Sequence, residues 1–396
     1  MILNILLDLT QLEPGRHEGV TTYVRNLIAE FDKTEGADRL VVRIQPGLDL
    51  PAIRRRGPVR IVERTRAQPA ALPVRAFRRV SRKLGLRPEG ELDRLLRRYR
   101  VQMIHYPFST IPRSDLGTTL PITLSVMDLQ HEYFPELFSP QALADRKAAF
   151  GPSAARANQI IAISNYTKQS LVEKLDVDSN KVTVIYLSGD LSQSPDNSLA
   201  LPTDFAYYPA GDWAHKNHEG LFDALAWLAE NRNFRPSLVL TGVTSNRLPR
   251  LLEQVRRRGL AQQVTHLGQV SYDQVAGIYA RARLLVFPSR FEGFGIPIVE
   301  AMRCGVPVVC SNTTSVPEAA GEAASYFDPE DPTAIAEAMY RVWHDRAYAD
   351  RLVTAGRKQA QQFSWARCAQ ETIGLYRKVL TQTSNLSLHS GLSRRP

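Results

Sequence analysis

The chain has 396 residues, of which 43% are hydrophobic and 23% are charged, a globular composition that excludes the disordered, collagen-like and disulfide-scaffold classes. At about 100–200 residues per domain, this length predicts two domains. The formal net charge is +10. Sixteen Arg and Lys against four acids between positions 54 and 100 give +12, so 34 basic and 36 acidic residues leave −2 elsewhere. The excess charge belongs to one patch.

The cysteines and the apolar runs predict the compartment. Cys304, Cys310 and Cys368 have no C-x-x-C spacing, so they predict neither a disulfide framework nor a usual zinc site. The apolar run 2–7 has no basic region before it and ends at Asp8, which favours a buried first strand over a signal peptide. No stretch reaches the ~18–20 apolar residues of a membrane span. We expect a cytoplasmic protein whose membrane contact is peripheral, on the inner face of the cytoplasmic membrane.

Short apolar runs alternate with amphipathic stretches along the chain, which predicts βαβ units, parallel sheets and the α/β class. The expected strands are 2–7, 41–44, 103–105, 122–126, 159–163, 182–186, 205–208, 237–240, 264–267, 284–287 and 306–309.

The alternation stops at 188–203, a polar and aperiodic segment that we interpret as a linker. The predicted organisation is therefore two Rossmann-like domains that face a cleft, where a ligand binds. The predicted parts are an acceptor-binding or membrane-facing domain at 1–190, a linker at 191–204, a nucleotide-sugar domain at 205–362, a helix at 363–380 that packs back on the first domain, and a flexible tail at 381–396.

The most informative segment is 287–310, FPSRFEGFGIPIVEAMRCGVPVVC. A strand ends there, a turn with Gly293 and Gly295 follows, and a proline takes a position that the first turn of a helix prefers. Glycines let backbone N–H groups approach a phosphate, and the helix N-terminus adds a favourable dipole. Glu292 before the turn and Glu300 in the helix are expected to face one ligand and accept hydrogen bonds from its hydroxyls.

This segment closely resembles the Glu-x7-Glu signature of the retaining glycosyltransferases of family 4, including the Gly-x-Pro-Val-Val start of the next strand. The resemblance covers about residues 1–380 and implies the GT-B fold. The other similar blocks are GVTTYVRNL at 19–27, DLQHEYFPE at 128–136, YPAGDWAHKNH at 208–218, SNTTSVPEAAGEA at 311–323 and FDP at 327–329. Block 128–136 is similar to a segment of O-chain and capsule-type sugar transferases.

The resemblance also implies roles for single residues. Glu292 would contact the transferred sugar, Glu300 the ribose of the donor, and Lys216 the diphosphate. Gly19 would let the first loop approach the same diphosphate, and the base would lie near Gly268. The implied catalytic residues are Glu292, Lys216, His131 and Asp128. The implied donor-binding residues are Glu300, Gly293, Phe294, Gly295, Ile296, Gly19, Arg290 and Gly268.

The implied reaction moves a hexose from a GDP- or UDP-linked sugar to a glycan or lipid-linked acceptor, with mannose from GDP-mannose as the first expectation. The departing phosphate would help to deprotonate the acceptor hydroxyl, so that attack occurs on the face it leaves. Cations and N–H donors held in place would stabilise the charge on the leaving group. No cofactor and no metal are expected.

Two positions depart from the family pattern. Many members carry an arginine six residues before the lysine, where this chain has Ala210. Either Lys216 works with another cation, with Arg290 and His215 as candidates, or phosphate binding is weaker. The usual His-Asp pair reads Met127-Asp128 here, which leaves His131 as the available histidine.

Simpler interpretations stand beside these. Glu292 and Glu300 are alternatively helix-start carboxylates, Lys216 the opening of a surface helix, and His131 a packing residue against Phe134. The flanking matches favour the functional interpretation of the two glutamates.

Two further motifs lack support. Asp176-Val177-Asp178 mimics a metal-binding Asp-x-Asp but lies in a polar turn, so a solvated turn is favoured. The segment 15–19 is not G-x-G-x-x-G, so a dinucleotide cofactor is not supported.

The basic patch has helical periodicity. Apolar residues of 74–84 and of 92–99 recur at helical spacing among basic ones, a pattern that favours an anionic membrane surface at about 1 kcal/mol per well-placed Lys or Arg. A solvated or partner-facing helix pair is the alternative. Nucleic acid is not expected, because the patch has few aromatic residues and no recognisable module. The residues that define the predicted membrane or acceptor patch are Arg75, Arg78, Arg79, Arg82 and Lys83.

Two rival functions remain. A phosphorylase or glycosyl-phosphate synthase on the same fold would release or consume free sugar phosphate. A non-catalytic sugar-nucleotide-binding scaffold would accommodate the departures at Ala210 and Met127.

Overall fold

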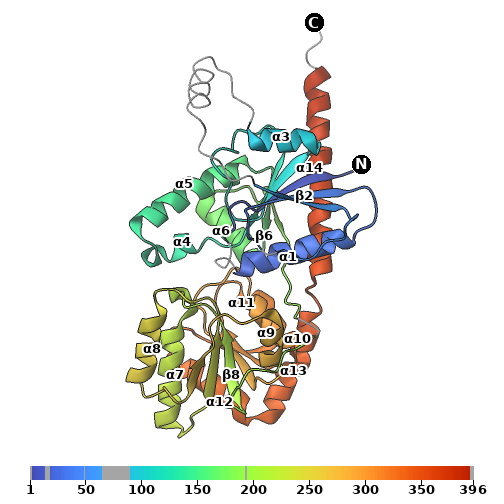
Figure 1. Ribbon diagram of the computed structural model, residues 1–396. Coiled ribbons are helices and arrows are strands. Elements are labelled where there is room, and N and C mark those ends of the chain that lie inside the picture. The colour runs from blue at the N-terminus through green and yellow to red at the C-terminus, as the bar shows by residue number, and fades with distance from the viewer. Residues whose placement is uncertain (1, 14–17, 49, 65–89, 192–193, 393–396) are drawn as a thin grey trace, which may run out of the picture. The chain divides into compact units, whose positions relative to one another are not determined.

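The computed structural model describes residues 2–13, 18–48, 50–64, 90–191 and 194–392 (Figure 1). The chain divides into two compact units. The first unit contains Met1–Ser125, Ala149–Ile160 and Ala369–Pro396, and the second contains Val126–Ala148 and Ile161–Cys368. The predicted domain boundaries stay a prediction.

A seven-stranded sheet has the order β3-β2-β1-β4-β5-β6-β7, with β1 pairing in parallel with both β2 and β4. Strand β1 is buried almost throughout, as expected for a central strand of a parallel sheet. The strands are β1 Asn4–Asp8, β2 Arg39–Ile44, β3 Val59–Glu63, β4 Met103–Tyr106, β5 Ile122–Val126, β6 Gln159–Ala162 and β7 Val182–Val184.

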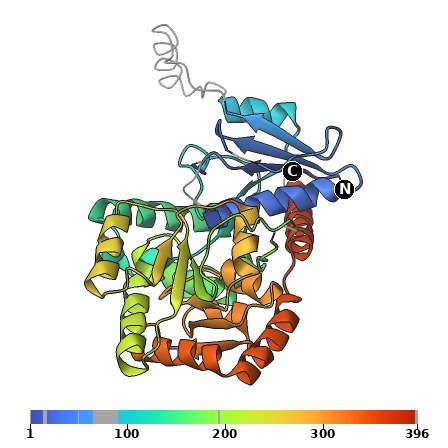
Figure 2. The same cartoon turned by 60° about the horizontal axis from the view of Figure 1, so that its bottom comes forward.

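Helix α14 (Trp365–Leu392) runs beside strands of the first unit (Figures 1 and 2). Its Tyr376 hydroxyl lies 2.6 Å from Nδ1 of His105, whose Nε2 lies 2.7 Å from the Ser125 hydroxyl. Burial lowers the pKa of His105 to about 3, so the ring is neutral in this network. The other helices in this half of the sequence are α1 Glu18–Lys33, α3 Glu91–Arg98, α4 Gln130–Tyr133, α5 Pro140–Arg156 and α6 Asn165–Leu175.

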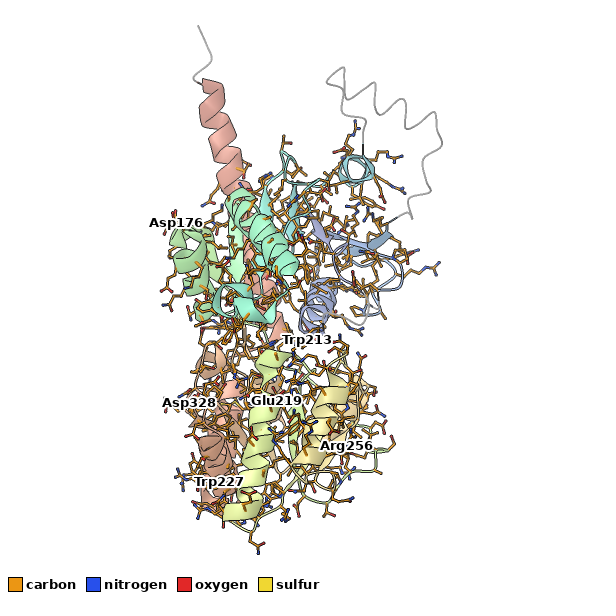
Figure 3. All side chains as sticks on the ribbon, turned by 90° about the vertical axis from the view of Figure 1, so that its left-hand side faces the viewer. Asp176, Trp213, Glu219, Trp227, Arg256 and Asp328 are labelled. Carbon is orange, nitrogen blue, oxygen red and sulfur yellow. The ribbon has the colours of Figure 1, made fainter. Side chains whose placement is uncertain are left out.

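The second sheet lies wholly in the second unit and has the order β10-β9-β8-β11-β12-β13, with parallel pairs throughout. Figure 1 shows helices α7 and α8 on one side of this sheet and α10 and α13 on the other. Figure 3 labels Glu219 and Trp227 on α7 and Arg256 on α8. The strands are β8 Phe205–Pro209, β9 Ser237–Thr241, β10 Val264–His266, β11 Leu284–Phe287, β12 Val308–Ser311 and β13 Ala324–Phe327. The helices are α7 His218–Asn231, α8 Leu248–Arg257, α9 Tyr272–Tyr279, α10 Ile296–Arg303, α11 Val316–Ala320, α12 Pro332–His344 and α13 Arg346–Ala360.

The α/β class and two parallel sheets confirm the predicted fold class, and every predicted strand is present within two residues at either end. Two strands, β3 and β13, were not predicted. Both lie at a sheet edge, where a strand is short and need not be apolar on both faces.

Two local expectations were wrong. Helix α14 continues to Leu392 instead of ending at residue 380, because the hydroxyls of Thr381, Thr383 and Ser384 bond carbonyls one turn earlier and fit inside the helix. Gly19 is the second residue of α1 rather than part of a loop. The helix starts there because buried residues such as Tyr23, Leu27 and Phe31 follow at helical spacing.

Candidate functional site

In the second sheet, successive strands run outward in opposite directions from the β8–β11 pair: β9 and β10 lie beyond β8, and β12 and β13 lie beyond β11. In open parallel α/β sheets, ligands bind beyond the carboxyl ends of the strands at such a switch point. The loop after β8 carries Lys216, and the loop after β11 carries Glu292. The topology therefore places both predicted catalytic residues at the edge where a ligand is expected.

Lys216 and Glu292 form an ion pair, with Nζ 2.7 Å from Oε1. Their side chains are 19% and 12% exposed, so both are sheltered but reachable from solvent. The Tyr208 hydroxyl donates to the Lys216 carbonyl at 2.7 Å and holds the lysine loop. The exposed Trp213 of the same loop is labelled in Figure 3. Lys216 thus belongs to a clamped turn rather than to an open surface helix.

The Glu292 loop is clamped by two hydroxyl residues that follow β12. Glu292 N–H donates to the Thr314 hydroxyl at 3.1 Å, and Thr314 holds a left-handed conformation with φ of 54°. The Ser315 hydroxyl donates to the Glu292 carbonyl at 2.8 Å. Sequence reasoning missed these supporting residues, and their only signal was the polar run SNTTS.

Glu300 lies on α10 and is buried. The Tyr279 hydroxyl donates to its Oε2 at 3.1 Å, and no ion pair to Glu300 exists among the described residues. Burial raises the pKa of Glu300 to about 7, and the nearby charge of Asp190 acts in the same direction. Tyr279 is a second residue that the sequence did not reveal.

The glycine turn has the backbone expected of it. Gly295 precedes α10 with φ of +118°, a conformation that side chains disfavour. A Cβ on Gly293 would lie 2.1 Å from the Met127 carbonyl oxygen, so no side chain fits there. Ile296 begins the helix, whereas the Phe294 ring is buried against Tyr186 and Phe363.

Asp128 and His131 lie in the second unit with the Lys216–Glu292 pair. Burial raises the pKa of Asp128, and the charge of Glu292 acts in the same direction. His131 is fully buried and packs edge-to-face on Phe138, with ring centroids 6.5 Å apart, and its packing against Phe134 stays a prediction. Burial lowers the pKa of His131 to about 4, with help from two nearby cations, so the ring is neutral near pH 7.

The two candidate cations, Arg290 and His215, lie in different electrostatic surroundings, and their roles stay a prediction. Arg290 donates through Nε and Nη2 to both carboxylate oxygens of Glu330, at 2.6 and 3.1 Å. Burial lowers the pKa of His215 well below its usual value, and the charge of Lys216 lowers it further. Gly268 adopts φ of +70°, and its carbonyl accepts from Gly242 N–H at 2.9 Å.

The basic patch is described in part. Residues 74–84, with all five predicted patch residues, lie outside the described residues. The second predicted helix is α3, where Leu95 is buried while Arg94, Arg97 and Arg98 are exposed, so the amphipathic pattern is confirmed there. In the described ranges, no helix is both long and apolar enough to cross a membrane.

The Asp-x-Asp motif is a turn. Asp176 caps the end of α6 in a left-handed conformation, and Asp178 accepts from Asn180 N–H at 2.9 Å (Figure 3). Both are exposed, which confirms the predicted solvated turn. The described parts of the chain hold no cluster of three or more His, Cys, Asp or Glu fit for a metal, and the expectation that no metal is needed stays a prediction.

Comparison with known proteins agrees with this geometry. Residues 17–193 match the family described as Glycosyltransferase Family 4, and residues 203–359 match Glycosyl transferases group 1. The O-antigen chain mannosyltransferase B of Escherichia coli is 30% identical over 296 residues, which cover 71% of this chain and 76% of that protein. The serotype-specific mannosyltransferase WbdA of E. coli is 33% identical over 57% of this chain, but the match spans only 29% of WbdA.

Two solved structures share the fold. Sucrose-phosphate synthase from Thermosynechococcus elongatus superposes with a TM-score of 0.70 at 20% identity, covering 96% of this chain and 100% of the other. Anabaena Alr3699/HepE in complex with UDP and glucose gives 0.68 at 18% identity, covering 95% of this chain and 100% of the other. The chain has the GT-B fold and belongs to the family 4 glycosyltransferases.

Proposed function

We propose that this glycosyltransferase moves a hexose, with mannose from GDP-mannose as the first candidate, to a glycan or lipid-linked acceptor in surface polysaccharide synthesis, with retention of configuration. The relatives named as O-antigen and serotype-specific mannosyltransferases support the sugar and the pathway class. A structural neighbour in complex with UDP-glucose supports a nucleotide-sugar donor.

The observation that carries the proposal is the Lys216–Glu292 pair at the switch point of the second sheet. Departure of a nucleoside diphosphate concentrates negative charge on its phosphates while the anomeric carbon becomes electron-poor. Lys216 would stabilise the phosphates, and Glu292 would face the sugar and release the lysine when the donor enters. Charged and polar groups held in place in this way make the largest single contribution to transition-state stabilisation in many enzymes. In this proposal neither a metal nor an organic cofactor takes part.

The test is release of GDP or UDP from a panel of nucleotide sugars by the purified protein, with and without lipid-linked glycan acceptors. We expect one donor to release nucleoside diphosphate, and the NMR coupling of the product to report the configuration of the donor. Free sugar phosphate as product would support a phosphorylase or synthase instead. Binding without turnover would support the scaffold, and absence of any nucleotide binding would contradict the family-based proposal.

We also propose that the basic patch faces an anionic membrane, where a lipid-linked acceptor is found. The exposed arginines of α3 support this, since each basic residue near such a surface contributes about 1 kcal/mol. Neutralising Arg94, Arg97 and Arg98 together should reduce co-sedimentation with vesicles containing phosphatidylglycerol, and raised salt should do the same. Binding that neither change reduces would contradict the membrane proposal.

A further inference from the structure

Ala210, in the loop after β8, is buried and brings no charge to this loop. The remaining lysine of the loop, Lys216, is already paired with Glu292. A diphosphate carries more negative charge than one lysine neutralises, so a second cation is expected close to this loop. The buried ring of His215 is neutral near pH 7, and Arg290 has a carboxylate partner of its own, Glu330, in an exposed ion pair.

The loop after β9 packs directly on the Ala210 loop. Ser245 N–H donates to Oδ2 of Asp212 at 2.8 Å. A Cβ on Gly242 would lie 2.6 Å from the carbonyl carbon of Ala210, so the two backbones are in contact there. Because β8 and β9 are neighbouring parallel strands, their loops leave the sheet at the same edge. Any side chain at the end of the β9 loop therefore starts close to the lysine loop.

Arg247 ends this loop, directly before α8. Its Nε is buried and has no hydrogen-bond partner, and within the described ranges no carboxylate lies within ion-pair distance of its guanidinium. Burying part of a guanidinium without a partner is costly, which indicates a ligand that the free protein lacks. The ligand must be an anion, since arginine offers only donors.

The charge of Arg247 reaches the lysine loop. The pKa of His215, the residue before Lys216, is lowered first by burial and then by the positive charges of Lys216, His218 and Arg247. Lys216 and Arg247 therefore both act on this ring, which is itself neutral near pH 7. A guanidinium without an ion-pair partner beside a lysine suits a multiply charged anion.

We propose that Arg247 supplies the second cation of the diphosphate site, from the β9 loop, in place of an arginine at position 210. This inference rests on the proposed nucleotide-sugar function. It assigns the phosphate contact to a residue outside every motif in the sequence. Arginine suits the task because its planar fork donates two parallel hydrogen bonds to one phosphate.

The test uses titration calorimetry with GDP or UDP, whichever the wild-type protein binds. It compares the affinity for this nucleoside diphosphate with the affinity for the matching nucleoside. Arg247→Gln should weaken diphosphate binding about tenfold or more, the loss expected for one charge-assisted hydrogen bond, and should leave nucleoside binding within twofold. Arg250→Gln is the matched control, because Arg250 lies on the same helix, is 72% exposed and pairs loosely with Glu219. That control should change diphosphate binding less than twofold.

If Arg247→Gln does not fold, Arg247→Lys provides the same test, since it keeps the charge but loses the fork. It should lose diphosphate affinity several-fold and no nucleoside affinity. Diphosphate affinity equal to the wild type in the folded variant overturns the role of Arg247 and leaves the proposed function intact. A wild type that binds neither nucleotide overturns the proposed function and this inference with it.

Discussion

The two glutamates of the Glu-x7-Glu motif occupy opposite kinds of environment. Glu292 lies on a loop at the carboxyl edge of the sheet, partly open to solvent and paired with Lys216 at 2.7 Å. Glu300 lies inside α10, buried, with a tyrosine hydroxyl as its partner. One carboxylate is balanced by a cation, and the other is held by a neutral donor where charge is costly.

This difference separates two tasks. An ion pair at the mouth of a site exchanges partners when a charged ligand enters, so Glu292 and Lys216 are suited to the reacting groups. A buried carboxyl whose pKa is about 7 gains from a new hydrogen-bond donor, so Glu300 is suited to holding a ligand hydroxyl. In the proposed function, the motif thus joins a reactive position to a binding position through one turn and the start of one helix.

The largest expected effect is on turnover. Glu292→Gln and Lys216→Ala should each lower kcat/KM by at least one to two orders of magnitude, as a loss of about 2–4 kcal/mol of transition-state stabilisation requires. Initial rates with the identified donor measure this, with Glu253→Gln on the exposed face of α8 as the control. Unchanged rates in both variants would show that the pair is structural and would remove the contrast with Glu300.

The next effect is on stability and its pH dependence. Because the folded pKa of Glu300 is about 7 and lies above its usual value of 4.5, the folded state keeps the proton while the unfolded state loses it as pH rises between these values. The free energy of unfolding should therefore fall with pH in this window and stay low above pH 7. Glu300→Gln removes this ionisation. The free energy of unfolding of the variant, measured relative to that of the wild type, should therefore rise by about 2–3 kcal/mol between pH 5 and pH 8.

Urea unfolding of the two proteins at both pH values measures this gain, with Glu337→Gln on the surface of α12 as the control. The same Glu300→Gln protein should bind nucleotide more weakly despite its greater stability. Equal pH profiles for the variant and the wild type would contradict the assignment of a costly buried carboxyl.

The smallest effect concerns Tyr279. Tyr279→Phe removes a hydrogen bond that lowers the pKa of Glu300, so that pKa should rise further and the carboxyl should be less well placed. We expect KM for the donor to rise about three- to tenfold, which is the effect of losing one hydrogen bond, and kcat to stay nearly unchanged. Tyr207→Phe is the control, since Tyr207 is also buried and its hydroxyl lies 2.7 Å from that of Thr241 instead. A fall in kcat alone would place Glu300 with the reacting groups and erase the distinction between the two glutamates.

Much of the fold was predictable because it depends on local pattern. Central strands such as β1 and β11 are apolar runs that only a doubly covered sheet accommodates. The glycine turn before α10 was also predicted correctly, since Gly295 has the positive φ that glycine permits. Edge strand β3 was missed because its exposed residues interrupt the apolar signal, and β13 was missed because its short sequence, Ala-Ser-Tyr-Phe, has no continuous apolar run.

For the candidate site, the family resemblance, the Glu-x7-Glu pair and the lysine could be read from the sequence, because their spacing lies within single strand–loop–helix units. Which side chains meet them depends on tertiary packing: Tyr279 lies beside Glu300, Thr314 and Ser315 lie around the Glu292 backbone, and the β9 loop of Arg247 lies against Ala210. These partners lie on a helix and on loops that follow other strands, and the order of those strands is set by the packing of the whole chain. In our proposal, a neighbouring loop in space supplies the second cation, because the two loops leave the sheet at the same edge.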